Sequence, residues 1–220
     1  MSLERPVILT LFGLPVTSTV VTTWVIVAVL LVTAALAGRR VSYKASRSQA
    51  VLEWGITTLR GMLAEMTGTT DDRYLPLVAT VASFVLVSNL VPVIPWVEAP
   101  TADINTPIAL SLIVFFSVHY FGVRELGVIN YLRKFAQPVV LLLPINVLSQ
   151  LTRTFSLAIR LFGNMISHQI IVAILLLILP LMLPAVLEVF GLFIGVIQAY
   201  IFTILTIVYI GSAVRADGDL

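Results

Sequence analysis

An arginine in the middle of a long apolar tract is the residue of this chain whose type and place most suggest chemistry. The formally charged residues between positions 135 and 212 are Arg153, Arg160 and Glu188. An arginine near the centre of a membrane helix costs about 2.5–3.5 kcal/mol on insertion scales. Such a charge is usually retained because it faces a pathway or a binding partner instead of lipid. Arg160 is therefore the first functional candidate.

Polar residues line up with Arg160 on a helical wheel. At about 100° per residue, Arg153 and Ser167 fall within about 20° of Arg160. Four more polar residues lie within about 40° of Arg160, namely Asn146, Ser149, Ser156 and Asn164. Two others, Gln150 and His168, lie near 80°. This polar stripe, from position 146 to 168, would extend over about 33 Å. It is long enough to line much of a route across a bilayer.

Simpler interpretations of the same residues stay open. Serine and asparagine in a membrane helix often only hydrogen-bond a neighbouring helix. Arg153 also fits a side chain that snorkels to the membrane interface. Arg160 also fits a buried pair with Glu188, although Asn164 and Gln198 offer it neutral partners.

The composition sets the class of protein. The chain is 59% hydrophobic and 11% charged, with a mean hydropathy of +1.07, whereas soluble domains carry about 25% charge. This predicts an all-α integral membrane protein. The absence of cysteine excludes disulfides, thiolate metal sites and thiol nucleophiles. The scattered basic residues argue against nucleic-acid binding. No catalytic triad, phosphate loop or metal-ligand cluster is present, so we expect no catalytic residues, metal or cofactor.

Hydropathy predicts a single membrane domain, residues 1–220, with five spans and one amphipathic interfacial helix. The first three spans are 16–37, 74–96 and 106–123, and the amphipathic helix is 46–67. Residues 136–212 form the last two spans as a long tilted hairpin, with Pro180 and Pro184 bracketing its turn. The tract before Pro180 is about twice as long as the bilayer requires, so it must tilt strongly, bend or begin outside the membrane. Pro138 and Pro144 are compatible with a late helix start or a bend.

Basic residues predict the orientation of the chain. The segment after the second span carries Glu98 and Asp103 and no basic residue. Those after the first and third spans are basic, with Arg39, Arg40, Lys44 and Arg47 in one and Arg124, Arg133 and Lys134 in the other. Because basic loops stay in the cytoplasm, the N-terminus is expected outside and the C-terminus inside.

Two stretches that carry polar residues resemble the signatures of subunit a of rotary F-type ATP synthases. They are Arg160-Leu-Phe-Gly-Asn164-Met165 and Gln198-Ala-Tyr-Ile-Phe-Thr-Ile-Leu-Thr-Ile-Val-Tyr209. Three shorter motifs occur in the expected order, namely Ser88-Asn89-Leu, Pro100-Thr-Ala-Asp103 and Leu143-Pro144. The resemblance covers essentially the whole chain after the first helix. It extends to variants of the family that carry Na⁺ instead of H⁺.

The resemblance implies a non-catalytic, multi-pass subunit in the plasma membrane of a bacterium. Such a stator packs its last two helices against a ring of c subunits, each with a mid-membrane carboxylate, and provides two half-channels for H⁺ or Na⁺. The other implied partners are the peripheral-stalk b subunits, further ATP synthase subunits and lipid. Arg160 matches the family's essential arginine, and Gln198 matches the glutamine facing it. The resulting ion-translocation set is Arg160, Gln198, Asn164, His168, Glu188, Ser167, Arg153, Gln150 and Asn146.

The chain departs from the family pattern at three positions. Gln169 stands where many members have Glu or His, Gly191 where they have His or Glu, and Gln150 where they have Glu. His168 and Glu188 are candidates for relocated equivalents in the outer half-channel, or for a structural clasp between the last two helices. Two other classes remain as alternatives. One is a stand-alone secondary transporter or channel with Arg160 in an anion or ion pathway, and the other is a structural or cofactor-holding subunit of a redox complex.

Overall fold

Five helical stretches of the described residues are long and apolar enough to cross a bilayer. The computed structural model describes residues 7–11, 14–39, 47–68, 71–94, 97–135, 140–178 and 182–215. The apolar stretches are Ser18–Arg39, Asp72–Val93, Asn105–Leu126, Leu143–Ile178 and Val186–Val214. They confirm the predicted class, because backbone groups in lipid are satisfied within helices.

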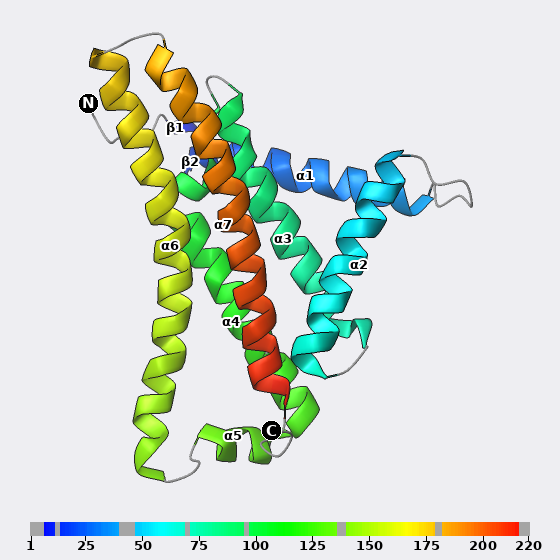
Figure 1. The fold of residues 1–220 in the computed structure, drawn as a ribbon. Helices are drawn as coiled ribbons and strands as arrows, with labels where there is room; N and C mark the ends of the chain where they lie inside the picture. The colour runs from blue at the N-terminus through cyan, green and yellow to red at the C-terminus, as the bar shows by residue number, and fades with distance from the viewer. Residues whose placement is uncertain are drawn as a thin grey trace.

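The helices surround a long C-terminal one (Figure 1). In chain order they are α1 (Ser18–Arg39), α2 (Arg47–Thr67), α3 (Leu75–Leu90), α4 (Asn105–Leu126), α5 (Val128–Phe135), α6 (Leu143–Ile178) and α7 (Met182–Val214). Short 3-10 helices are η1 (Asp72–Tyr74), η2 (Val91–Val93), η3 (Pro100–Ala102) and η4 (Val140–Leu142). An antiparallel hairpin of β1 (Val7–Leu11) and β2 (Leu14–Thr17) precedes α1 and was not predicted.

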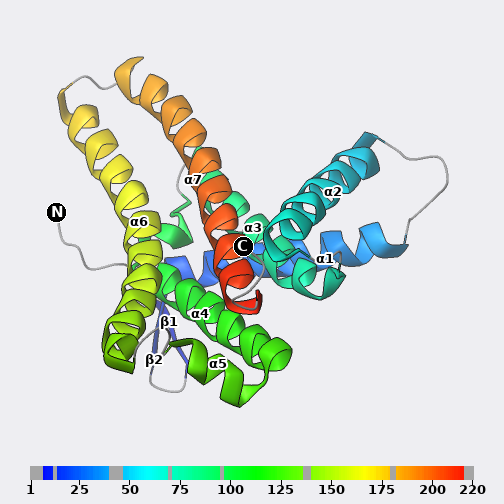
Figure 2. The same ribbon diagram turned by 60° about the horizontal axis from the view of Figure 1, so that its bottom comes forward.

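The core lies where α7 packs against α2, α3, α4 and α6. Phe202, Ile207 and Ile210 of α7 are almost completely buried there. Valines supply much of the opposing surface, namely Val78 and Val85 from α3 and Val114 and Val118 from α4. In contrast, α1 projects sideways from the bundle in both views and remains largely exposed (Figures 1 and 2).

The last two helices form the long hairpin, and each exceeds the thickness of a bilayer. At 36 residues, α6 is about 54 Å long. It starts at Leu143, so Pro144 lies in its first turn, where a missing N–H removes no helical hydrogen bond. Pro184 likewise lies in the first turn of α7, inside the helix instead of at the turn of the hairpin. Pro138 and Pro180 lie outside the described residues.

Helix α5 lies in the basic segment after the third span, where the sequence predicts no helix. Eight residues are too few for a clear apolar period, and isolated helices of this length are marginal in water. Packing against α4 stabilises it instead: Tyr131 is buried, and a Cβ at Gly122 would overlap its ring. Gly127, with φ +77°, ends α4 and lets the chain reverse into α5.

The two ends of the bundle differ in charge. We call the end that carries α5 and the last turn of α7 the basic end, because Arg133 and Lys134 lie there. Here Arg60 pairs with Asp72 at 2.7 Å, and Arg73 pairs with Glu125 at 2.7 Å. We call the opposite end, with η3 and the start of α1, the acidic end. There Ser18 donates to Glu98 at 2.7 Å and Thr19 donates to Asp103 at 3.0 Å.

The close crossing of α2 and α7 allows a test of the fold. A Cβ at Gly211 would lie 2.7 Å from the carbonyl oxygen of Met66, which is backbone and cannot rotate away. We expect Gly211→Ala to destabilise the purified protein by about 1–3 kcal/mol, measured as a lower thermal unfolding midpoint. Gly55→Ala is the control, since nothing lies within 4 Å of its Cβ. It should stabilise α2 slightly. Equal midpoints for the two variants would contradict this crossing.

Candidate functional site

Much of the polar stripe of α6 lies on a face that the chain itself does not cover. Arg153, Ser156, Arg160, Asn164 and Ser167 are exposed. The residues by which α6 packs on the bundle are instead Leu157, Ala158, Leu161, Met165 and Val172. An apolar helix that presents polar side chains away from its own protein requires another surface or water to meet them. The stripe is therefore the first part of the candidate site.

Arg160 projects from this face without a partner in the described part of the chain. No hydrogen bond or ion pair of its guanidinium is found among residues 7–11, 14–39, 47–68, 71–94, 97–135, 140–178 and 182–215. Glu188 lies beside His168 instead, so the buried Arg160–Glu188 pair is not formed. The positive charge thus remains available to a group outside this chain.

One helical turn from Arg160, an amide pair joins the two long helices. Asn164 Nδ2 donates to Gln198 Oε1 at 2.6 Å. Gln198 is only 3% exposed, and its Nε2 has no hydrogen-bond partner among the described residues. A buried donor without a partner costs about 1–3 kcal/mol. Such a donor suits a site whose second component comes from elsewhere.

A third helix holds this part of α7 in place, which sequence analysis did not anticipate. Asn89 of α3 donates from Nδ2 to the Gly195 carbonyl at 3.1 Å, and its Oδ1 accepts from Thr101 at 3.0 Å. Both side chains are buried, and a Cβ at Gly195 would come within 3.1 Å of Asn89 Cβ. The motifs that contain Asn89 and Thr101 marked these residues, but no local pattern indicated which carbonyl Asn89 binds.

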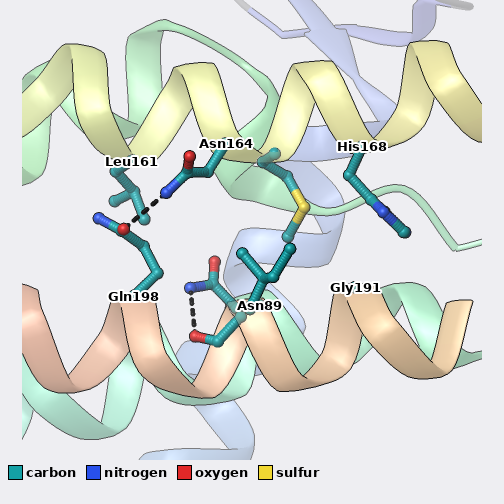
Figure 3. A pocket seen from close by; sticks show the side chains of 9 residues that line it. Asn89, Leu161, Asn164, His168, Gly191 and Gln198 are labelled. Atoms are coloured by element: carbon teal, nitrogen blue, oxygen red, sulfur yellow. Dashed lines mark hydrogen bonds between the residues drawn. The ribbon is translucent and has the colours of Figure 1, made fainter. Parts of the chain in front are cut away.

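A small cavity separates these polar groups from His168 (Figure 3). Its polar lining comes from Asn89, Asn164, His168 and Gln198, and its remaining walls are Leu161, Met165, Gly191, Ile194 and Gly195. In Figure 3 the Asn164–Gln198 bond lies at one side of the cavity and the imidazole of His168 at the other. Helices α3, α6 and α7 therefore meet at one point with neutral amides and one titratable ring.

His168 reaches across to α7 over a glycine. Its Nε2 lies 3.5 Å from Glu188 Oε2. A Cβ at Gly191 would overlap the imidazole ring, so the ring occupies the space that any side chain at position 191 would fill. This contact explains why histidine at 168 coexists with glycine at 191, where the family resemblance leads one to expect His or Glu.

The remaining predicted residues lie on α6 toward the basic end. Asn146 Nδ2 donates to the Phe135 carbonyl at 2.9 Å, which ties the start of α6 to α5. Gln150 is half-buried and Arg153 is exposed. The structure does not bring this group together with Gln198. His119, a histidine outside the predicted set, lies in an aromatic cluster with Phe115, Tyr131 and Phe135. No group of three His, Cys, Asp or Glu residues suited to a metal occurs in the described part of the chain.

Comparison with known proteins gives a consistent result. The family model described as ATP synthase A chain matches residues 20–211. ATP synthase subunit a 2 of Bradyrhizobium sp. is 46% identical over 199 residues, which is 90% of this chain and 89% of that protein. ATP synthase subunit a of Moorella thermoacetica is 42% identical over 212 residues, covering 96% and 97% of the two chains. ATP synthase subunit a 1 of Chlorobaculum parvum is 43% identical over 199 residues, covering 90% and 88%.

The matched region includes η3, α3 through α6 and α7 as far as residue 211, and hence every residue that lines the cavity or belongs to the polar stripe. With five apolar helices in its described residues, the chain is a multi-span membrane protein that belongs to the ATP synthase A chain family, the family of ATP synthase subunit a.

Proposed function

We propose that this chain is the ion-translocating stator subunit of a rotary ATP synthase and performs no nucleotide chemistry itself. The observation that carries the proposal is Arg160, exposed on a polar stripe and unpaired among the described residues. The partner that meets this face is a ring of c subunits, each carrying a membrane carboxylate. Peripheral-stalk b subunits and the nucleotide-binding subunits complete the assembly, and the cargo is H⁺ or Na⁺.

The chemistry of arginine suits this role. A guanidinium stays protonated at any working pH. At a low-dielectric interface it favours the ionised form of a carboxylate that passes it. A ring carboxylate therefore releases its ion as it approaches Arg160. The same fixed positive charge repels a cation that would otherwise leak directly between the two half-channels. The Asn164–Gln198 pair supports this function because neutral amides leave the guanidinium unneutralised.

The two access routes use residues on either side of Arg160. We assign Ser167, His168 and Glu188 to the outer half-channel, toward the turn of the α6–α7 hairpin. Asn146, Gln150 and Arg153 belong to the inner half-channel, toward the basic end. The basic end faces the cytoplasm of a bacterium and the acidic end faces outward, which places the N-terminus outside and the C-terminus inside. The charge difference between the two ends supports this orientation.

Replacing Arg160 tests the central assignment. Arg160→Ala should abolish ion-driven ATP synthesis and ATP-driven pumping in membrane vesicles. Without the guanidinium, nothing at this position favours the ionised form of the ring carboxylate, so the carboxylate does not release its ion. Arg160→Lys should restore little, since a buried ammonium loses its charge more readily and lacks the guanidinium's planar set of donors. Arg124→Ala, at an exposed cation outside the polar stripe, is the control and should retain activity. Normal coupled synthesis by Arg160→Ala in a fully assembled complex would refute the mechanism.

Single cysteines test the orientation, because the natural chain contains none. Thr101 is fully buried and therefore unsuitable, whereas Ile104 at the acidic end is 47% exposed and Leu132 in α5 is 61% exposed. A membrane-impermeant thiol reagent should label Ile104→Cys from outside the cell. It should label Leu132→Cys only in inverted vesicles. The opposite pattern would reverse the assignment of the half-channels.

The contact between His168 and Gly191 separates a pathway role from a structural clasp. Gly191→Ala should displace the imidazole and slow ion translocation in an assembled complex, and His168→Ala should do the same by removing it. In the His168→Ala background, Gly191→Ala should slow translocation little further, because the space of the imidazole ring is already vacant. The measurement is the rate of ATP-driven pumping across a pH series. A clasp predicts instead a lower yield of assembled complex and normal pumping by the complexes that form. Glu188→Gln distinguishes the pathway role from the clasp by the same two measurements, the pumping rate and the yield of assembled complex.

A further inference from the structure

The two long helices are in direct polar contact toward the acidic end and separate toward the basic end. In the described ranges 140–178 and 182–215, their interhelical polar contacts are Asn164–Gln198 and His168–Glu188. Both views show α6 and α7 moving apart from there toward the basic end (Figures 1 and 2). Figure 1 also shows α5 lying across the gap at the bottom.

The end of α5 is bonded to both sides of this gap. On one side, Lys134 Nζ donates to the Ser212 carbonyl at 2.8 Å and to the Arg215 carbonyl at 2.7 Å. On the other side, the Phe135 carbonyl accepts from Asn146 Nδ2 of α6 at 2.9 Å. Two consecutive residues of one short helix thus connect the start of α6 with the end of α7.

The chemistry of each bond suits a fixed connection. The last carbonyls of a helix lack partners within it and carry partial negative charge, so an ammonium is a favourable cap. The last turn of α7 contains no basic residue of its own, and Lys134 supplies that cation from another helix. Arg215 in turn donates from Nη2 to the Glu65 carbonyl of α2 at 2.8 Å, which holds the same end of α7 against the bundle.

The middle of α5 is anchored as well. Tyr131 packs over Gly122, and its ring lies edge-on to those of His119 and Phe135. Burial raises the pKa of Tyr131, so its hydroxyl stays neutral in this packing. Consequently Tyr131 fixes α5 to α4, while Lys134 and Phe135 at the end of α5 bond to α7 and α6.

We propose that α5 is a strut that sets the separation of α6 and α7 at the basic end, with Lys134 and Asn146 as its positioning residues. This inference rests on the proposed function, in which that gap forms the inner half-channel. The strut fixes how wide the opening is where Asn146, Gln150 and Arg153 lie. Neither positioning residue needs to touch the ion for this role.

A distance measurement tests the strut without relying on ion transport. Spin labels are placed at Leu148→Cys, which is 64% exposed on α6, and at the exposed Ser212→Cys on α7, in the whole complex reconstituted in liposomes. Pulsed electron resonance then reports the distribution of label distances. Lys134→Met should lengthen and broaden this distribution, and Asn146→Leu should do so as well. Lys134→Arg should return it to the native distribution, because a guanidinium can donate to both carbonyls.

Arg133→Met is the matched control, since this neighbouring cation is exposed and makes no hydrogen bond or ion pair among the described residues. It should leave the label distances unchanged. Passive ion flux through vesicles stripped of the soluble ATPase head provides the second readout. Lys134→Met should change this flux and Lys134→Arg should restore it. Unchanged label distances in Lys134→Met, or equal shifts in Arg133→Met, would overturn the strut. Failure of the proposed function would appear separately, as coupled synthesis by Arg160→Ala with the distances still responding to Lys134.

Discussion

An unpaired positive charge on a membrane helix constrains much of the rest of this structure. In the proposed mechanism the guanidinium of Arg160 acts on a passing carboxylate, which requires that no permanent anion neutralises it within the chain. The groups around it are accordingly amides: Asn164 bonds Gln198, and Asn89 bonds the backbone of α7. The carboxylate of Glu188, on the same helix as Gln198, lies beside His168 instead. Neutral partners thus shape the site without cancelling the charge that gives it a function.

Close helix packing is what places those amides. The C-terminal helix carries glycine at three of its contacts, Gly191 under His168, Gly195 against Asn89 and Gly211 against the Met66 carbonyl. Small residues allow membrane helices to approach closely, where dispersion and short hydrogen bonds replace the hydrophobic drive available in water. Because Gly195 is one turn from Gln198, the Asn89 bond also sets the rotation of α7 that directs Gln198 toward α6.

Local periodicity explains what could be predicted from the sequence. The five apolar helices, and the alignment of Arg153 and Ser167 with Arg160, follow from one-dimensional patterns and appear in the structure. Contacts between distant segments do not leave such patterns. The bond from Asn89 to Gly195 joins residues 106 positions apart, and that from Lys134 to Arg215 joins residues 81 apart. Helix α5 could not be predicted for the same reason. Its eight residues are too few to form a stable helix alone, and the packing of Tyr131 against Gly122 of α4 stabilises it.

The two halves of the α6–α7 hairpin therefore differ in kind. Toward its turn the helices touch through the side chains of His168 and Glu188, and Asn164 bonds Gln198. Toward the basic end the helices are apart (Figure 1) and joined through α5, whose Phe135 carbonyl accepts a hydrogen bond from Asn146 of α6. In the proposed function, the opening at this end depends on the separation that α5 sets. In the proposed function Arg160 lies between these two halves of the hairpin, where one fixed charge separates the access from one side of the membrane from the access from the other.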